Sequence, residues 1–422
     1  MANLCIFLSF LIFSGFYLFK KEYARSFIFL IISMTAISGF LVGRQVDIID
    51  IHDFLFVAYV IIFLFIFVYF ATFWLKRYKK NDLIYDFPNF KAVGVGLICI
   101  LLPLLLINLY IFYNSIIIVV IDAIVDIDEY KNEGGVDEYL RGIIGSLPLF
   151  ISRAFSPLAF FCIPLSIISL INNNTKLGFL LLICSLNWAL LSMMSFSRSG
   201  LVSYILLIAT MYMSFWNYFG YRSKRIILNI STLSLIAAFV LITYISTERF
   251  GDEDYWVFNQ SGDILINNVV WFSIFDYFSQ WIEHSFFLYK SNDFLLFPHG
   301  HHLVTLFHQL NLPIISDRMS WVDYRLENMG EFASYFVGLP YIFYMDFGFF
   351  GLIIIFLLMT IFTLLSQYSA SLRSLYFIVS PYLIMVSCMF FSDSHFAYTY
   401  VQQAAVFSLI LFVLVRYKYK FR

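Results

Sequence analysis

Charged residues are scarce in this sequence. Only 13% of its 422 residues are Asp, Glu, Lys or Arg, whereas soluble domains hold about a quarter. Hydrophobic residues make up 61% of the chain and aromatic residues 21%. So little charge excludes a water-soluble enzyme, a disordered chain and a nucleic-acid-binding protein, because all three depend on abundant solvated charge. The composition predicts a membrane protein that has no nucleic acid as a partner.

Common catalytic and cofactor motifs are also missing. The sequence contains neither glycine-rich nucleotide loop, GxxxxGKS/T or GxGxxG, and it has no HExxH, GxSxG or paired-cysteine motif. Its five cysteines all lie in apolar runs, so we expect no disulfide framework. We expect no cofactor and no metal, and a reaction that draws its energy from a substrate held in the membrane.

Eleven apolar runs are long enough to cross a bilayer, which takes about 17–25 residues. They lie at 3–19, 26–42, 54–75, 92–113, 154–171, 177–195, 201–219, 226–245, 349–365, 375–391 and 396–415. We therefore expect an all-α polytopic membrane protein with three parts. These are spans 1–8 at 1–245, a large and partly helical extracytoplasmic loop at 246–348, and spans 9–11 with a basic tail at 349–422.

Two further segments have a distinctive pattern. Residues 115–140 place Asp122, Asp126, Glu129 and Glu133 on one helical stripe among Ile and Val, which is typical of a helix lying in the membrane interface. Acceptor hydroxyls could bind there, and a purely structural role is the alternative. The end of the long loop, near 332–348, is interrupted by glycine and proline, which suggests a re-entrant approach to the ninth span.

Charge is distributed very unevenly between the two sides of the predicted topology. The connectors after odd-numbered runs up to the seventh, the corresponding ones later in the chain and the C-terminal tail hold 17 of the 26 basic residues but three of the 27 acids. Short basic loops stay in the cytoplasm. This places the N-terminus outside and the C-terminus in the cytoplasm, and it puts all seven His on the outer side.

Three outer arginines are expected at the membrane border. Arg153 opens the fifth span in SRAFSPLAF, Arg198 lies in the tight SFSRSG hairpin, and Arg249 follows the eighth span in TERFG. A guanidinium group is always charged and its planar fork matches phosphate oxygens. Together the three favour a shared anionic ligand, such as a diphosphate that joins a lipid to a sugar. The alternative is that each pairs with an outer acid or reaches toward lipid headgroups.

The loop before the ninth span mixes arginine, carboxylate and aromatic residues. Arg318 and Arg325 are interleaved with acids in SDRMSWVDYRLENMGEF, beside Trp321 and Tyr324. Aromatic rings stack on sugar faces and carboxylates bind sugar hydroxyls, so the mixture suits a sugar-phosphate ligand. An ordinary solvated amphipathic segment is the alternative.

A general base is expected in the same loop. Glu331 is one candidate, and His301 and His302 in FPHGHHLVTLFH are two others, because imidazole titrates near the working pH. The HxHH run could instead bind zinc, but this would need a ligand from elsewhere in the chain. Satisfied loop histidines are the third reading.

With these residues the chain resembles the bacterial O-antigen polymerases of the Wzy type. The resemblance covers the layout of nearly the whole chain, and locally it rests on SRAFSPLAF, SFSRSG, ERFG and GLPYIFYMDFGFFG. It implies a GT-C-like fold related to O-antigen ligases. Those ligases carry a His before a paired-glycine element, whereas here the position eleven before Gly348 is Val337. This departure argues against ligase activity and leaves the base unidentified.

The resemblance also implies a function and partners. It implies a glycosyltransferase of the inner membrane that polymerises undecaprenyl-diphosphate-linked oligosaccharide units into a surface polysaccharide, without a cofactor. Membrane lipids, a chain-length regulator and a flippase are the implied partners. Two other readings stay open: a polysaccharide or lipid-linked oligosaccharide transporter, and a sugar-binding scaffold.

Overall fold

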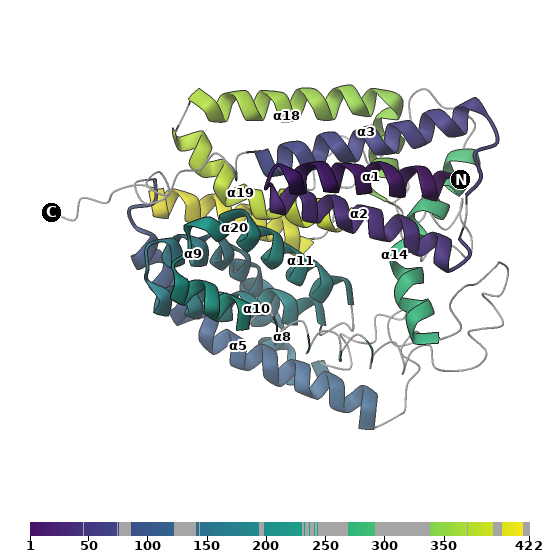
Figure 1. The fold of residues 1–422 in the computed structure, drawn as a ribbon. Helices are drawn as coiled ribbons and strands as arrows, with labels where there is room; N and C mark the ends of the chain where they lie inside the picture. The colour runs from purple at the N-terminus through teal and green to yellow at the C-terminus, as the bar shows by residue number, and fades with distance from the viewer. Residues whose placement is uncertain are drawn as a thin grey trace, which may run out of the picture. The chain divides into compact units, whose positions relative to one another are not determined.

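The computed structural model describes the chain at 1–44, 46–73, 75, 86–121, 141–142, 144–193, 198–229, 232, 236, 240, 243, 269–291, 338–368, 370–390 and 399–416 (Figure 1). These residues are almost all helical, and none of them forms a strand. The expectation of an all-helical protein is therefore confirmed for the part of the chain that is described.

Seven helices among the described residues are long and apolar enough to cross a membrane. They are Ala2–Phe19, Tyr23–Leu41, Ile51–Phe73, Phe90–Asn114, Ser146–Ile171, Leu201–Tyr218 and Gly348–Leu365. Three shorter apolar helices follow the sixth, tenth and eleventh expected spans, at Thr175–Leu191, Ser374–Cys388 and Val406–Arg416. The chain is a helical membrane protein. The count of eleven spans stays a prediction, because most of the eighth, 226–245, lies outside the described residues.

The helices group into two compact units. Unit 1 contains α1 (Ala2–Phe19), α2 (Tyr23–Leu41), α3 (Ile51–Phe73), α14 (Val269–Ser291), α17 (Leu339–Phe347), η5 (Gly348–Phe350) and α18 (Gly351–Tyr368) as far as residue 365. Unit 2 contains α5 (Phe90–Ile121), α8 (Ser146–Phe155), η1 (Ser156–Leu158), α9 (Ala159–Ile171), α10 (Thr175–Met193), α11 (Arg198–Phe215), η2 (Trp216–Tyr218), α19 (Ala370–Cys388) as far as residue 385, and α20 (Thr399–Arg416).

Aromatic side chains fill the core of unit 1. Along α3 the residues Phe56, Tyr59, Phe63 and Phe67 follow helical spacing, and neighbouring rings in this series stack at centroid distances of 6.0 to 6.2 Å. Rings that repeat every three or four residues face the same side of a helix. The buried face of α3 is therefore one continuous aromatic stripe, against which α17 packs.

Arg25, at the start of α2, ties the first three helices of unit 1 together. Its guanidinium carbon lies 4.8 Å from the ring centroid of Tyr17 and 4.6 Å from that of Tyr69. Nε donates to the Thr72 hydroxyl at 2.8 Å, and Nη1 forms an ion pair with Glu22 at 2.5 Å. The arginine is almost fully buried. A charge at this depth is stable only because each of its sides meets a partner.

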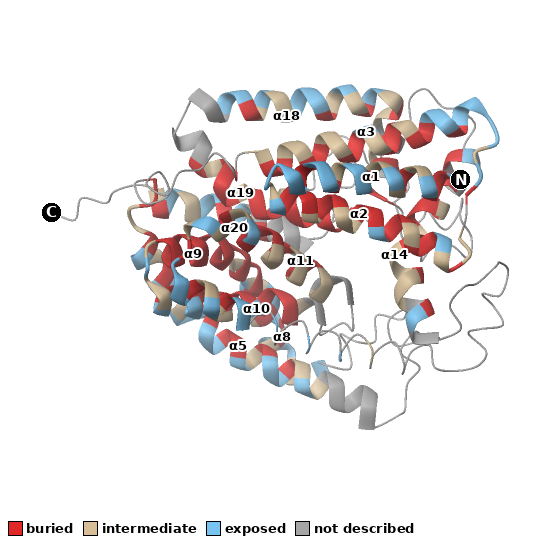
Figure 2. Cartoon of the chain, in the orientation of Figure 1, coloured by how far each residue is buried: buried red, intermediate tan, exposed pale blue. Residues whose placement is uncertain are grey.

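Buried polar side chains hold unit 2 together. Asn108 of α5 donates to Asn187 of α10 at 2.7 Å and to Ser156 of η1 at 2.9 Å. Tyr204 and Tyr212 of α11 share hydrogen bonds of 2.7 Å with Ser185 and Ser166. Hydrogen bonds between helices specify how neighbours pack where lipid gives no hydrophobic drive. Every residue of α9 is buried, and Figure 2 shows this helix almost wholly in red, while α18 presents mostly exposed and intermediate residues.

Replacing Arg25 by alanine is expected to destabilise the protein by about 3–5 kcal/mol, because Glu22 would keep its charge in a nearly buried place without a partner. Thermal unfolding of the detergent-solubilised protein measures this. Lys20→Ala is the matched control, since Lys20 is exposed, and its unfolding temperature should stay close to that of the wild type. Equal unfolding temperatures for the two variants would contradict the role of Arg25.

Candidate functional site

Two of the residues expected to form the site are described by the structure, Arg153 and Arg198. The other expected residues lie outside the described residues and stay predictions. They are Arg249, His301, His302, Arg318, Trp321, Tyr324, Arg325 and Glu331. The acidic stripe of the expected interfacial helix also lies outside, but the backbone of 115–121 continues α5 rather than beginning a new helix.

Arg153 lies within its helix rather than at its start. The fifth candidate span begins at Ser146, so Arg153 follows about two helical turns later, near the end of α8. Leu149 and Ser152 are buried in the unit, while Leu147, Phe150 and Arg153 are exposed. These three follow one another at intervals of three residues and so share a face. The face combines an apolar surface suited to lipid with one guanidinium group.

Arg198 is the first residue of α11. Helices α9 and α10 pack against each other around the turn at 172–174, so the chain reverses direction there, and α11 packs next to α10. The helix from Arg153 to Ile171 and the helix from Thr175 to Met193 each rise by about 27 Å. Arg153 therefore lies level with the end of α10, next to which α11 begins at Arg198.

This placement suits an anionic headgroup at the membrane border. The distance of about 27 Å from the opposite helix ends is close to the thickness of the hydrocarbon core, about 30 Å. Arg153 thus lies where phosphate groups of a lipid meet the apolar core. Two guanidinium groups at this level can hold the oxygens of a diphosphate. The position of Arg198 is that of its backbone.

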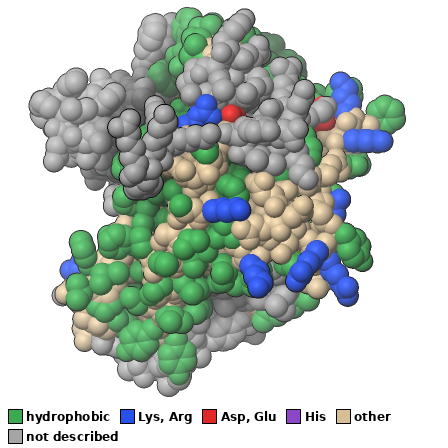
Figure 3. Space-filling model, turned by 90° about the vertical axis from the view of Figure 1, so that its left-hand side faces the viewer, with side chains coloured by type: hydrophobic (Ala, Val, Ile, Leu, Met, Phe, Trp, Pro, Cys, Tyr) green, Lys and Arg blue, Asp and Glu red, His purple; other side chains and the backbone are tan. Residues whose placement is uncertain are grey.

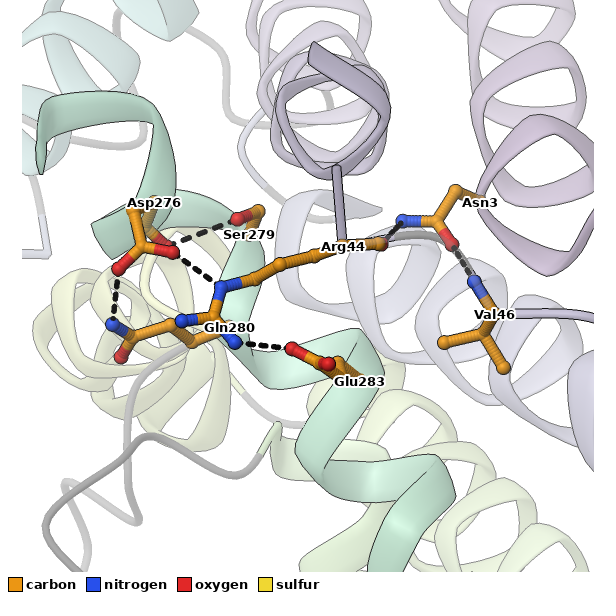
Figure 4. A network of polar contacts seen from close by, with 7 residues as sticks. All are labelled: Asn3, Arg44, Val46, Asp276, Ser279, Gln280 and Glu283. Atoms are coloured by element: carbon orange, nitrogen blue, oxygen red, sulfur yellow. Dashed lines mark hydrogen bonds and ion pairs between the residues drawn. The ribbon is translucent and has the colours of Figure 1, made fainter. Parts of the chain in front are cut away.

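A third arginine has a different environment, which its sequence context did not reveal. Arg44, after the end of α2, reaches α14 in unit 1, where Nε bonds to Asp276 and Nη1 to Glu283 (Figure 4). Gln280 donates to the second oxygen of Asp276 at 2.8 Å. The loop that carries Arg44 is fixed by Asn3, whose amide donates to the Arg44 carbonyl at 3.1 Å and accepts from the Val46 amide at 3.2 Å.

Electrostatics make Arg44 a structural residue rather than a phosphate ligand. Burial alone lowers the pKa of its guanidinium group, but the charges of Asp276 and Glu283 outweigh burial and raise that pKa above its usual value. One positive charge meets two negative ones, so the cluster as a whole is negative and repels an anion. Among the described residues, no group of three or more His, Cys, Asp or Glu could hold a metal ion.

The rest of α14 is also fixed to the helices of unit 1. Trp281 donates from Nε1 to the Thr35 hydroxyl at 3.4 Å, the Tyr289 hydroxyl donates to the His52 carbonyl at 3.1 Å, and Lys290 forms an ion pair with Asp53 at 3.0 Å. The helix falls in the segment expected to form the extracytoplasmic loop. It therefore forms a fixed base within that segment.

The chain returns to α14 at Gly338. Its amide donates to Ser285 Oγ at 3.3 Å, and a Cβ atom added there would lie 2.6 Å from Trp281 Cε3. Only glycine allows this approach without displacing the indole ring. Helix α17 follows and ends at Gly348, whose φ of 57° and ψ of −148° suit glycine alone. The stretch before α18 is thus broken at Gly348, and α17 has nine residues.

Loss of the Arg44 side chain is expected to cost about 3–5 kcal/mol of unfolding free energy, because Asp276 is nearly inaccessible and would be left with an uncompensated charge. Denaturant unfolding in detergent measures it. Asp276→Asn in the Arg44→Ala background should restore part of the loss by removing the buried charge.

Glu283→Gln is the control within the same cluster. The Glu283 side chain is 40% exposed, so its ion pair is screened by solvent and its loss should cost less than about 1 kcal/mol. A larger loss from Glu283→Gln than from Arg44→Ala would show that the ranking by burial is wrong.

Comparisons with known proteins give no relative for this chain. No protein-family model matches it, no curated protein is significantly similar in sequence, and no solved structure is significantly similar in fold. The functional argument therefore depends on the residues and their placement.

Proposed function

We propose that this protein is a membrane glycosyltransferase that joins undecaprenyl-diphosphate-linked oligosaccharide repeat units into a surface polysaccharide, such as O-antigen, at the periplasmic face of the bacterial inner membrane. The observation that carries the proposal is the placement of Arg153 and Arg198 at one end of unit 2 and at the same level. That level suits a diphosphate whose lipid tail lies in the bilayer. The exposed Leu147 and Phe150 beside Arg153 suit the tail.

In the proposed reaction the growing chain is the donor. A hydroxyl oxygen on the terminal sugar of a second lipid-linked unit attacks the anomeric carbon of the donor. The bond from that carbon to the diphosphate oxygen breaks, and polyprenyl diphosphate leaves with the bonding electrons. The proton of the attacking hydroxyl passes to a base, for which Glu331, His301 and His302 are the candidates.

The arginines stabilise the charge that develops on the leaving group. Arg153, Arg198 and Arg249 would hold the diphosphate, with Arg318 and Arg325 positioning the donor or acceptor phosphate. Trp321 and Tyr324 would stack on sugar rings. Guanidinium groups fit this role because they keep their charge at any physiological pH and bind two oxygens at once.

The proposed topology follows from the distribution of charge. The N-terminus lies outside and the C-terminus in the cytoplasm, since most basic residues fall on the C-terminal side of this arrangement. In the view of Figure 3 the charged side chains visible among the described residues are mostly Lys and Arg. Acceptor and donor would then meet at the opposite end, with a flippase and a chain-length regulator as partners.

Arg198→Ala is expected to abolish polymerisation, because the leaving diphosphate loses a charge that no water molecule replaces. Arg198→Lys should restore less than about a tenth of the product, since an ammonium group lacks the bidentate fork. The polysaccharide ladder of complemented deletion cells measures both, with the amount of membrane-inserted protein as a check. Arg141→Ala is the control, because Arg141 is an exposed arginine expected on the same side. Full-length polysaccharide in the Arg198→Ala cells would overturn the assignment.

Deletion of the gene separates the proposal from its alternatives. A polymerase defect leaves single repeat units on the cell surface, because transport and ligation of one unit still proceed. Loss of a transporter or flippase leaves no repeat units there, and loss of a scaffold changes only the chain lengths. Electrophoresis of surface glycans from the deletion strain distinguishes the three, and a surface without any repeat unit would favour a transporter.

A further inference from the structure

Two neighbouring turns in unit 2 carry a set of basic side chains, here called the basic turn surface. It consists of Lys176, Arg222, Lys224 and Arg225. Lys176 follows the turn between α9 and α10, and the other three follow η2. The turns are in contact, since a Cβ atom at Gly220 would lie 3.3 Å from Asn173 Oδ1. Residues far apart in the sequence thus form one surface.

The first of these turns is held in a defined shape by its own asparagines. Asn172 donates to the Ile168 carbonyl at 3.0 Å, and Asn174 Oδ1 accepts from the Leu177 amide at 3.4 Å as an N-cap of α10. Asn173 has a φ of 59°, which asparagine tolerates better than most residues. In the second turn the Lys224 amide donates to the Gly220 carbonyl at 3.0 Å. The basic side chains therefore start from fixed backbone positions.

The positive charge of the basic turn surface is not compensated. Lys176, Arg222 and Arg225 are exposed, and none of the four forms an ion pair with a carboxylate of the described residues. Within the described part of unit 2, Asp86 is the one acidic residue, and it forms an ion pair with Arg416 at 3.0 Å. The surface therefore attracts anions.

Aromatic residues place this surface at the level of lipid headgroups. Trp216 and Tyr218 form η2, where the apolar run of α11 ends, and the ammonium group of Lys224 lies 5.5 Å from the Trp216 ring centroid. Tyr221 is 82% exposed. Trp and Tyr are enriched where a membrane meets water, because one end of each ring is apolar and the other polar. Basic residues among them face phosphates rather than bulk water.

We propose that the basic turn surface binds the phosphates of anionic phospholipids in the leaflet that this end of unit 2 faces. Charge complementarity argues for this occupant, since four uncompensated cations meet headgroups that carry one or two negative charges. Each Lys or Arg near an anionic membrane contributes about 1 kcal/mol, which corresponds to about a fivefold change in affinity. This inference does not depend on the proposed function, because it concerns residues at the opposite end of unit 2 from Arg153 and Arg198.

Native mass spectrometry of the purified full-length protein tests the proposal, with phosphatidylglycerol, diphosphatidylglycerol and phosphatidylcholine of equal chain length as probes. The wild type should retain the two anionic lipids at least about tenfold better than the zwitterionic one. The triple variant Lys176→Gln, Arg222→Gln, Arg225→Gln should lose this preference. The variant Lys176→Arg, Arg222→Lys, Arg225→Lys keeps the charge and should keep the preference.

The matched control replaces three other exposed basic residues, Lys20, Lys21 and Lys91, by Gln. It changes the net charge equally and should leave the lipid preference intact. Equal losses in both triple variants would show that only total charge matters and would overturn the site. A wild type without preference would overturn it too, even if the neutralised variant failed to fold. Displacement of the lipid by millimolar inorganic phosphate would assign the surface to a soluble anion instead.

Discussion

A polar group in the interior of this protein has no water to fall back on, and this constraint determines which of its residues pair. Arg25 is enclosed by two rings, a hydroxyl and a carboxylate, and Arg44 by two carboxylates. Asn108 and Asn187 play the uncharged version of this role in unit 2. In a bilayer an unpaired group of this kind costs several kcal/mol, so such pairs select one arrangement of helices among many apolar alternatives.

The same constraint separates two kinds of arginine. Those with carboxylate partners, such as Arg25 and Arg44, are held in place and unsuited to an anionic ligand. Arg153 is exposed on an apolar face, and no ion pair with a described carboxylate is found for it. The basic turn surface combines exposure with aromatic neighbours. Burial and partners, rather than residue type, divide structural cations from those available to a ligand.

Much of the fold could be predicted from the apolar runs, because about 20 apolar residues in a bilayer leave a helix as the one stable local structure. The limits of helices were harder to predict. Arg153 was expected to begin its span but lies about two turns inside it, since Leu147 and Phe150 extend the apolar face backward. The pairing of Arg44 with α14 depends on contact between residues distant in sequence. The spacing of Asp276 and Glu283, two helical turns apart, was the available signal. Most of the expected site lies outside the described residues and remains a prediction.

The seating of Gly338 on Trp281 has a consequence for how this family of sequences can vary. The polypeptide leaves α14 at Ser291 and comes back to the same helix beside Ser285, so both ends of the intervening stretch are pinned to one rigid support. The entropy of closing such a loop grows only logarithmically, by about 0.6 kcal/mol for each doubling of its length. Insertions and replacements there leave the helical scaffold almost untouched. Surface glycans of new composition can thus be met by remodelling one stretch of chain, while the bundle beneath it stays the same.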